Sequence, residues 1–168
     1  NAASTFNTGS GSQVFLYPGV TANVADGIVQ TIPDGTQLVI VAPSLVLGSG
    51  SQLIDNTTTG VGILFESDGN GFASQSVVTQ AGSTGTLGTA GGTIQFTIDT
   101  GTLLEFSRAG SSGTATLQLN GGPVTVASGG SGVNIDSNVK VQTNNSITFD
   151  MNNDTFTDNG TITSTSSA

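Results

Sequence analysis

The chain has 168 residues, of which 11 are acidic and 2 are basic, and its net charge at pH 7 is −9. Two isolated cations, Arg108 and Lys140, cannot supply the clustered positive charge that nucleic acids and anionic membrane surfaces require of a partner. The absence of His and Cys excludes Ser-His-Asp and Cys-His catalysis and the usual transition-metal sites, and the scarcity of Glu, Lys and Arg disfavours long helices.

Residues 1–13 are predicted to form an N-terminal arm. They contain one large apolar residue, Phe6, and end in a flexible Gly/Ser stretch. The first residues, Asn1-Ala2-Ala3-Ser4, look like a mature terminus after removal of a secretory signal, the alternative being a trimmed chain. The arm is expected to lie on a neighbouring subunit or to fold back on its own domain, and the protein is expected to be extracellular.

Residues 14–168 are predicted to form a single β-rich domain, because apolar residues occur there in short bursts separated by turn residues. Many bursts are apolar-x-apolar triplets, such as Ile94-Gln95-Phe96 and Val139-Lys140-Val141, whose alternation places the apolar pair on one face of a strand. None is long enough to span a bilayer. The predicted strands centre on Val14–Tyr17, Ile28–Ile32, Leu38–Val41, Leu45–Leu47, Leu53–Ile54, Ile63–Phe65, Val77–Val78, Ile94–Ile98, Leu103–Phe106, Leu117–Leu119, Val124–Val126, Val133–Ile135, Val139–Val141 and Ile147–Phe149, with weaker ones at Phe156 and Ile162.

Two all-β architectures fit this pattern. A β-solenoid, similar to a right-handed β-helix, stacks coils of short strands with their apolar side chains inside. A β-sandwich or jelly roll pairs longer antiparallel strands. The short strands after Leu87 favour the solenoid, whereas Pro18, Pro33 and Pro43 make the N-terminal part look like sandwich strands or an irregular cap. No repeat of fixed period is visible, which counts against a regular solenoid, but the solenoid is favoured.

The stretch from Thr84 to Gly132 contains the segments GTLGTAGGTIQF, GTLLEF, GTATLQLNGG and TVASGG. In the composition of these segments it resembles the passenger domains of autotransporters and of filamentous-haemagglutinin-like adhesins. The resemblance is one of composition and covers only this part of the chain. It implies a right-handed β-helix with a surface-exposed, rod-like or adhesive role.

Paired carboxylates are the remaining catalytic candidates, since glycoside hydrolysis uses two of them. Glu66 with Asp68 and Asp99 with Glu105 are such pairs. A sugar groove normally offers aromatic platforms, and this chain has one Tyr and no Trp. The pairs are therefore interpreted as solvated turn carboxylates, and the protein is predicted not to be an enzyme.

Calcium is the one cofactor that the sequence suggests. Asp150, Asn152 and Asp154 place oxygen donors at the first, third and fifth positions of a turn, as calcium loops do. The rest of the loop pattern is missing, because Thr155 replaces the required Gly and Thr161 the bidentate Glu. The range 66–71 is a second oxygen-rich turn, and the alternative for both is a plain Asx-rich turn.

The leading functional hypothesis is a structural subunit of an extracellular filament or surface assembly, which binds copies of itself through strand edges and the N-terminal arm. The alternatives are an adhesin that binds surface glycans and a viral capsid-decoration or tail-fibre protein. The residues expected to anchor assembly are apolar and lie near the N-terminus: Phe6, Val14, Phe15, Leu16 and Tyr17.

Overall fold

The computed structural model describes residues 11–16, 21–67, 73–129 and 131–165, which form three β-sheets of six strands each. No helix among these residues could cross a membrane. Sheet 1 contains β1 (Ser12–Leu16), β4 (Thr36–Ile40), β7 (Val61–Glu66), β10 (Thr93–Ile98), β13 (Val124–Ser128) and β16 (Ile147–Asp150). Sheet 2 contains β2 (Ala22–Val24), β5 (Ser44–Leu47), β8 (Ser74–Gln80), β11 (Leu103–Ala109), β14 (Gly132–Ile135) and β17 (Phe156–Asp158). Sheet 3 contains β3 (Val29–Ile32), β6 (Gln52–Asp55), β9 (Thr84–Thr89), β12 (Ala115–Asn120), β15 (Val139–Thr143) and β18 (Thr161–Ser164).

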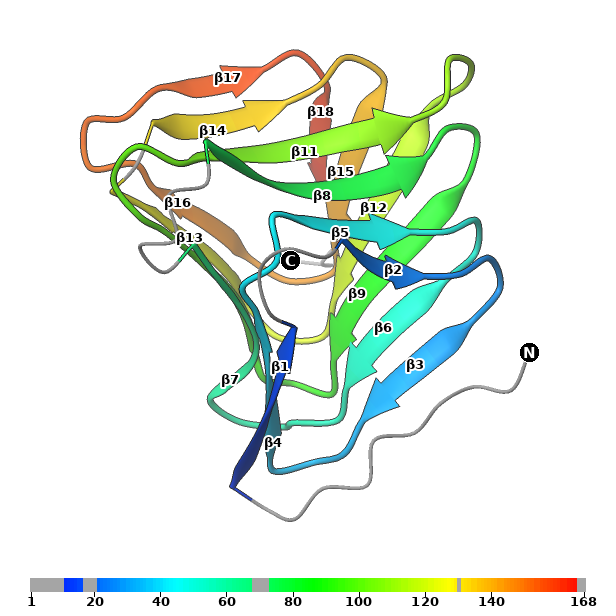
Figure 1. The fold of residues 1–168 in the computed structure, drawn as a ribbon, viewed down its shortest axis with the longest axis vertical. Helices are drawn as coiled ribbons and strands as arrows, with labels where there is room; N and C mark the ends of the chain where they lie inside the picture. The colour runs from blue at the N-terminus through cyan, green and yellow to red at the C-terminus, as the bar shows by residue number, and fades with distance from the viewer. Residues whose placement is uncertain (1–10, 17–20, 68–72, 130, 166–168) are drawn as a thin grey trace.

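The chain visits the three sheets in rotation, so every three consecutive strands form one coil of a stack (Figure 1). Each strand pairs in parallel with the strand three places along the chain, for example β4 with β7 and β7 with β10. Parallel pairing between successive coils defines a β-solenoid, so the predicted solenoid is confirmed. The sandwich alternative is wrong, because it requires antiparallel neighbours.

The N-terminal part belongs to the same stack, which corrects the expectation of sandwich strands or an irregular cap there. Strands β1 to β6 continue the sheets without change of direction. Pro33 lies between β3 and β4, and Pro43 between β4 and β5. Both prolines are therefore at corners of the coil, where no ladder hydrogen bond from the backbone nitrogen is needed.

The coils differ in length, which explains why no fixed repeat is visible in the sequence. The stacked residues Gln13 and Gln37 are 24 positions apart in the chain. Thr86 and Gln118, stacked in the same way on sheet 3, are 32 positions apart. The corners between strands take up most of the extra residues, and one register shift lies inside a strand pair, between Thr93–Val61 and Ile94–Ile63 of β10 and β7. The period therefore changes from coil to coil.

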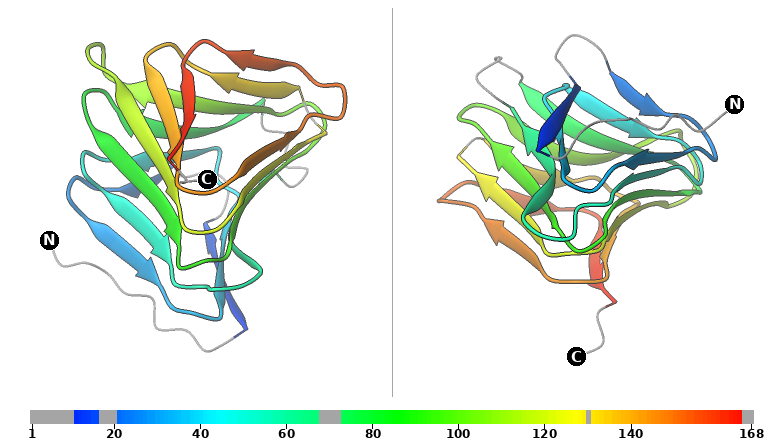
Figure 2. Two further views of the ribbon diagram at one scale, coloured as in Figure 1. Left: turned by 180° about the vertical axis from the view of Figure 1, so that it is seen from behind. Right: turned by 90° about the horizontal axis from the view of Figure 1, so that it is seen from below.

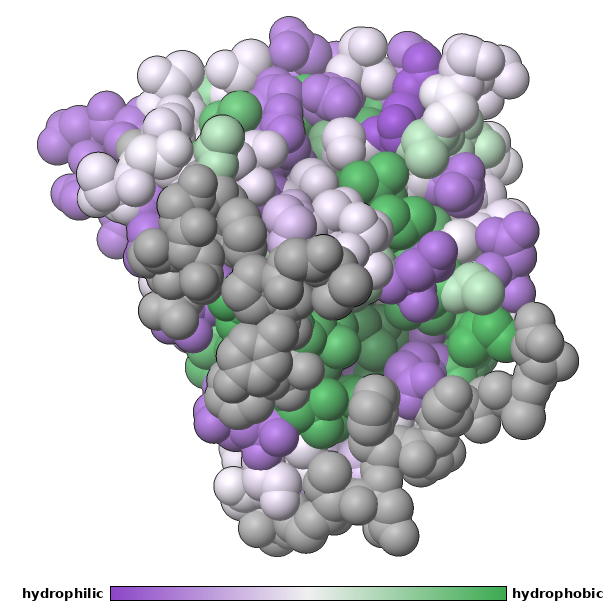
Figure 3. All heavy atoms as spheres, in the orientation of Figure 1, coloured by the Kyte–Doolittle hydropathy of each residue, from purple (hydrophilic) through white to green (hydrophobic). Residues whose placement is uncertain are grey.

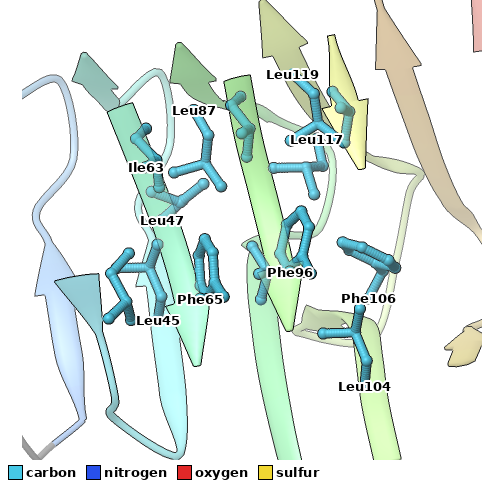
Figure 4. Packing of buried hydrophobic residues seen from close by; sticks show 14 of the residues in the cluster. Leu45, Leu47, Ile63, Phe65, Leu87, Phe96, Leu104, Phe106, Leu117 and Leu119 are labelled. Carbon is cyan, nitrogen blue, oxygen red and sulfur yellow. The ribbon is translucent and has the colours of Figure 1, made fainter. Parts of the chain in front are cut away.

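Inward side chains stack on one another to form the core. Leu38, Ile63, Ile94 and Val124 occupy one register position in four successive coils, and each is at most 1% exposed. Phe96 stacks on Phe65 with a centroid distance of 4.5 Å and meets Phe106 edge-on at 5.5 Å (Figure 4). The predicted alternation of apolar and polar residues thus produces a largely apolar interior, although Gln75 and Thr79 of β8 are buried polar residues within it.

Candidate functional site

The two ends of the stack are open. Within the described chain, the coil formed by β1, β2 and β3 and the coil formed by β16, β17 and β18 each pair with a neighbour on one side only. The right-hand view of Figure 2 places these two coils, blue and orange to red, at opposite ends. Backbone N–H and C=O groups of six strands are thus available to a further strand.

The N-terminal end exposes part of the core. Val14, Leu16, Ala22 and Ile28 pack against the buried cluster but are themselves only partly buried, because no coil covers them among the described residues. Figure 3 shows hydrophobic atoms in the lower half of this face, in the area that β1, β2 and β3 frame in Figure 1. This end is an apolar surface bordered by strand edges.

The C-terminal end has the same character. Ile147 lies over Val124 and Phe156 over Val133, in register. The two valines are 0% and 1% exposed, whereas Ile147 is only partly buried and Phe156 is 38% exposed. Phe156 contacts the ring of Phe149 at a centroid distance of 4.8 Å. Equivalent positions are therefore buried inside the stack and open at its end.

Asp158 is a charged residue at an inward position of this end. It is in register with Ile135, which is in register with Phe106 and, through it, with Val77 and Leu45. The side chain of Asp158 is exposed, and its Oδ1 accepts a hydrogen bond from the Gly160 N–H at 2.9 Å. A carboxylate thus occupies, in the last coil, a position that is apolar in the coils below.

The predicted assembly residues lie partly in the N-terminal coil. Val14 and Leu16 are inward residues of β1, which pairs with β4 of the same chain. Strand β1 begins at Ser12, inside the range assigned to the arm. Phe6, Tyr17 and the side chain of Phe15 lie outside the described residues.

The calcium candidates lie at the end of β16, where Asp150 is the last residue, and in the turn that follows. Asp150 and Asn152 line a cleft of about 470 Å³ together with Asp99. Asp154 is engaged elsewhere, since its Oδ2 accepts a hydrogen bond from the Ser128 hydroxyl at 2.8 Å. In the part of the chain that the structure describes, no group of three or more His, Cys, Asp or Glu side chains is arranged to hold a metal ion.

The carboxylate pairs considered for catalysis lie at separate places. Glu66 is the last residue of β7, and Asp68 lies outside the described residues. Asp99 follows β10 on sheet 1, whereas Glu105 is in β11 on sheet 2. Glu105 has Ser76 and Asn134 as its neighbours on adjacent strands.

A buried carboxyl group that the sequence interpretation missed belongs to Asp55, the last residue of β6. Asp55 is 0% exposed, its Oδ1 accepts the Thr57 N–H at 2.7 Å, and its Oδ2 has no hydrogen-bond partner. Burial raises the pKa of Asp55, although hydrogen bonds from Thr57 and Leu38 oppose the shift. The signal was present in the sequence, because strand alternation puts Asp55 on the same side as Leu53.

Replacing Asp55 with Asn is expected to raise the melting temperature at pH 7 and to flatten its dependence on pH. Because the folded-state pKa of Asp55 lies above its ordinary value, the stability it contributes is complete below the unfolded-state pKa and is lost as pH rises through the folded-state pKa. Asn keeps an oxygen for Thr57 and carries no charge. Thermal unfolding of both proteins from pH 3.5 to 8 measures this, with Asp150→Asn, at an exposed carboxyl group that does not act on Asp55, as control. Equal pH dependence for the parent and Asp55→Asn would contradict the prediction.

Comparison with protein-family models, with curated proteins and with solved structures found no significant match to this chain. The resemblance to adhesin passenger domains therefore rests on residue composition alone.

Proposed function

We propose that this protein is a structural subunit of an extracellular filament or surface assembly that self-associates through its strand edges. The observation that carries the proposal is the pair of open ends. Among the described residues, each end has three strands that pair on one side only, with partly buried apolar residues at its centre. An N-terminal arm, residues 1–13 with Phe6 as its apolar anchor, is part of the proposed contact.

The geometry of the ends favours an open polymer over a closed ring. The two ends are different surfaces, so a contact between them is heterologous, and the next copy again presents a free end. Parallel strand edges accept a further strand without any change in the subunit. Repetition of this contact along the stack direction would give a rod.

The charge of the chain works against this association. With a net charge of −9, neighbouring subunits repel one another over roughly 8–10 Å at physiological ionic strength. Both end coils carry acidic residues, Asp26 and Asp34 at one end and Asp150, Asp154 and Asp158 at the other. Salt should therefore promote assembly.

Negative-stain electron microscopy and light scattering of the purified full chain test the proposal. We expect filaments whose mean length increases as NaCl is raised from about 0.01 to 0.5 M, since the Debye length falls from about 30 Å to a few ångströms. A variant without residues 1–10 tests the arm and leaves β1 intact. Isolated particles or closed trimers at every salt concentration would contradict the proposed function, and unimpaired filaments without residues 1–10 would remove the arm from it.

A further inference from the structure

We infer that subunits stack coaxially, so that the C-terminal coil of one copy continues into the N-terminal coil of the next, with β16 pairing with β1, β17 with β2 and β18 with β3. The inference rests on the proposed function and specifies its partner as a second copy of this chain. It also assigns a role to Asp158, as a charge that limits this contact.

The first argument is that the two ends match in size. Strands β17 and β2 have 3 residues each, β18 and β3 have 4 each, and β16 and β1 have 4 and 5, whereas β8 and β11 inside the stack have 7. The coil lengths also match. Near the N-terminus the stacked residues Gln13 and Gln37 are 24 positions apart, and Ala22 and Leu45 are 23 apart. Near the C-terminus Val124 and Ile147 are 23 apart, and Lys140 and Thr161 are 21 apart.

The second argument is that the internal register, continued by one coil, brings apolar residues together. Val14 and Ile147 occupy the same register position, five coils apart, and so do Leu16 and Phe149 in the same two strands. In a coaxial stack Ile147 would therefore cover Val14 of the next copy. Both side chains are only partly buried in the single chain, and the contact would bury them as their counterparts in the inner coils are buried.

On sheet 3 the same continuation defines a pair of outward residues. The register runs from Val29 through Gln52, Thr86, Gln118 and Gln142 to Thr163. Thr163 of one copy would thus lie directly opposite Val29 of the next. Val29 is a large hydrophobic residue that is 41% exposed in the single chain.

Asp158 is the exception to this match. Its register position in the N-terminal coil is that of Ala22, so stacking would place its carboxylate between Ile135 below and Ala22 of the next copy above. Burying a charge without a partner opposes association, and an inward-pointing charge at a sheet edge is a known protection against uncontrolled growth. Asp136 follows β14, the strand next to β17, and adds a second negative charge. Arg108 lines the same pocket as Asp136, and its guanidinium donates a hydrogen bond to the Gly113 carbonyl.

Engineered cysteines can test the register, because the chain has no cysteine of its own. Directly opposite residues on neighbouring strands are about 4.8 Å apart, within the range of roughly 4.4–6.8 Å between Cα atoms that a disulfide spans. The double variant Val29→Cys/Thr163→Cys is therefore expected to give a ladder of covalent oligomers on a non-reducing gel after mild oxidation of filaments. The matched control Val29→Cys/Thr161→Cys shifts one partner by two residues, to about 8 Å, and should give no ladder.

Two further variants make every outcome informative. Gln118→Cys/Gln142→Cys places a directly opposite pair inside one chain and shows that this ladder of sheet 3 accepts a disulfide. Asp158→Asn is expected to lower the critical concentration for assembly at least tenfold. Filaments that form without the Val29–Thr163 cross-link, although the intrachain pair oxidises, would overturn the coaxial register and leave the proposed function standing. The absence of oligomers in every variant would overturn both, and an unchanged critical concentration for Asp158→Asn would refute the role of Asp158.

Discussion

Replacing Phe96 with Ala is expected to lower the free energy of unfolding by about 3–5 kcal/mol, the usual cost of removing a buried aromatic ring. Phe96 is 0% exposed and contacts two other rings, Phe65 at 4.5 Å and Phe106 at 5.5 Å between centroids. The three rings come from β7 and β10 of sheet 1 and β11 of sheet 2, at the middle of the stack. The coils above and below cannot collapse into the space because their backbones are held by parallel ladders.

Equilibrium unfolding in urea measures this loss, and Phe149→Ala is the matched control. The substitution Phe149→Ala removes the same kind of side chain from the last coil, where Phe149 is only partly buried. In the unassembled protein, Phe149→Ala should lower the free energy of unfolding by less than half as much as Phe96→Ala does. Equal costs at the two positions would show that the ends of the stack are as well packed as its middle, contrary to the structure.

Gly121→Ala is expected to lower the free energy of unfolding by about 3 kcal/mol or more. Gly121 has a φ of +107°, which disfavours any side chain, and an added Cβ would lie against the Thr89 carbonyl oxygen, well inside contact distance. Thr89 is held in place as well, because its hydroxyl donates to the Gly92 carbonyl and accepts the Gly122 N–H at 3.2 Å. Neither partner can move without breaking this corner of the coil.

Gly101→Ala separates the cost of the positive φ from the cost of the close approach between coils. Gly101 also has a positive φ, +87°, but an added Cβ would meet no atom within 4 Å. The substitution should lower the free energy of unfolding by about 1–2 kcal/mol, which is the cost of holding Ala in the left-handed conformation. Thermal or urea unfolding of the two variants gives the difference. A cost for Gly101→Ala as large as that for Gly121→Ala would assign the whole effect to backbone conformation and none to the close approach of the two coils.

Most strands could be predicted from the sequence because each is encoded locally. In Ile94-Gln95-Phe96 the alternation alone indicates which side chains turn inward, and both apolar residues are 0% exposed. Strand β9 was missed, since its TGTLGT sequence has one large apolar residue. Its Gly85 is compatible with the core because Leu47, from the coil below, occupies the space in which a Cβ would lie. Strand β2, with the short sequence ANV, was missed for lack of a pattern.

By itself the sequence determined that the protein is all-β, which residues form most of its strands and which side of each strand is apolar, because these depend on neighbours one or two positions away. The tertiary structure alone decided which strands pair, since the hydrogen-bond partners lie 24 positions away in one coil and 32 in another. It also decided that Asp55 is buried while Asp158 remains exposed at an end. Alternation places both carboxylates inward, and only the presence or absence of a further coil above them distinguishes the two.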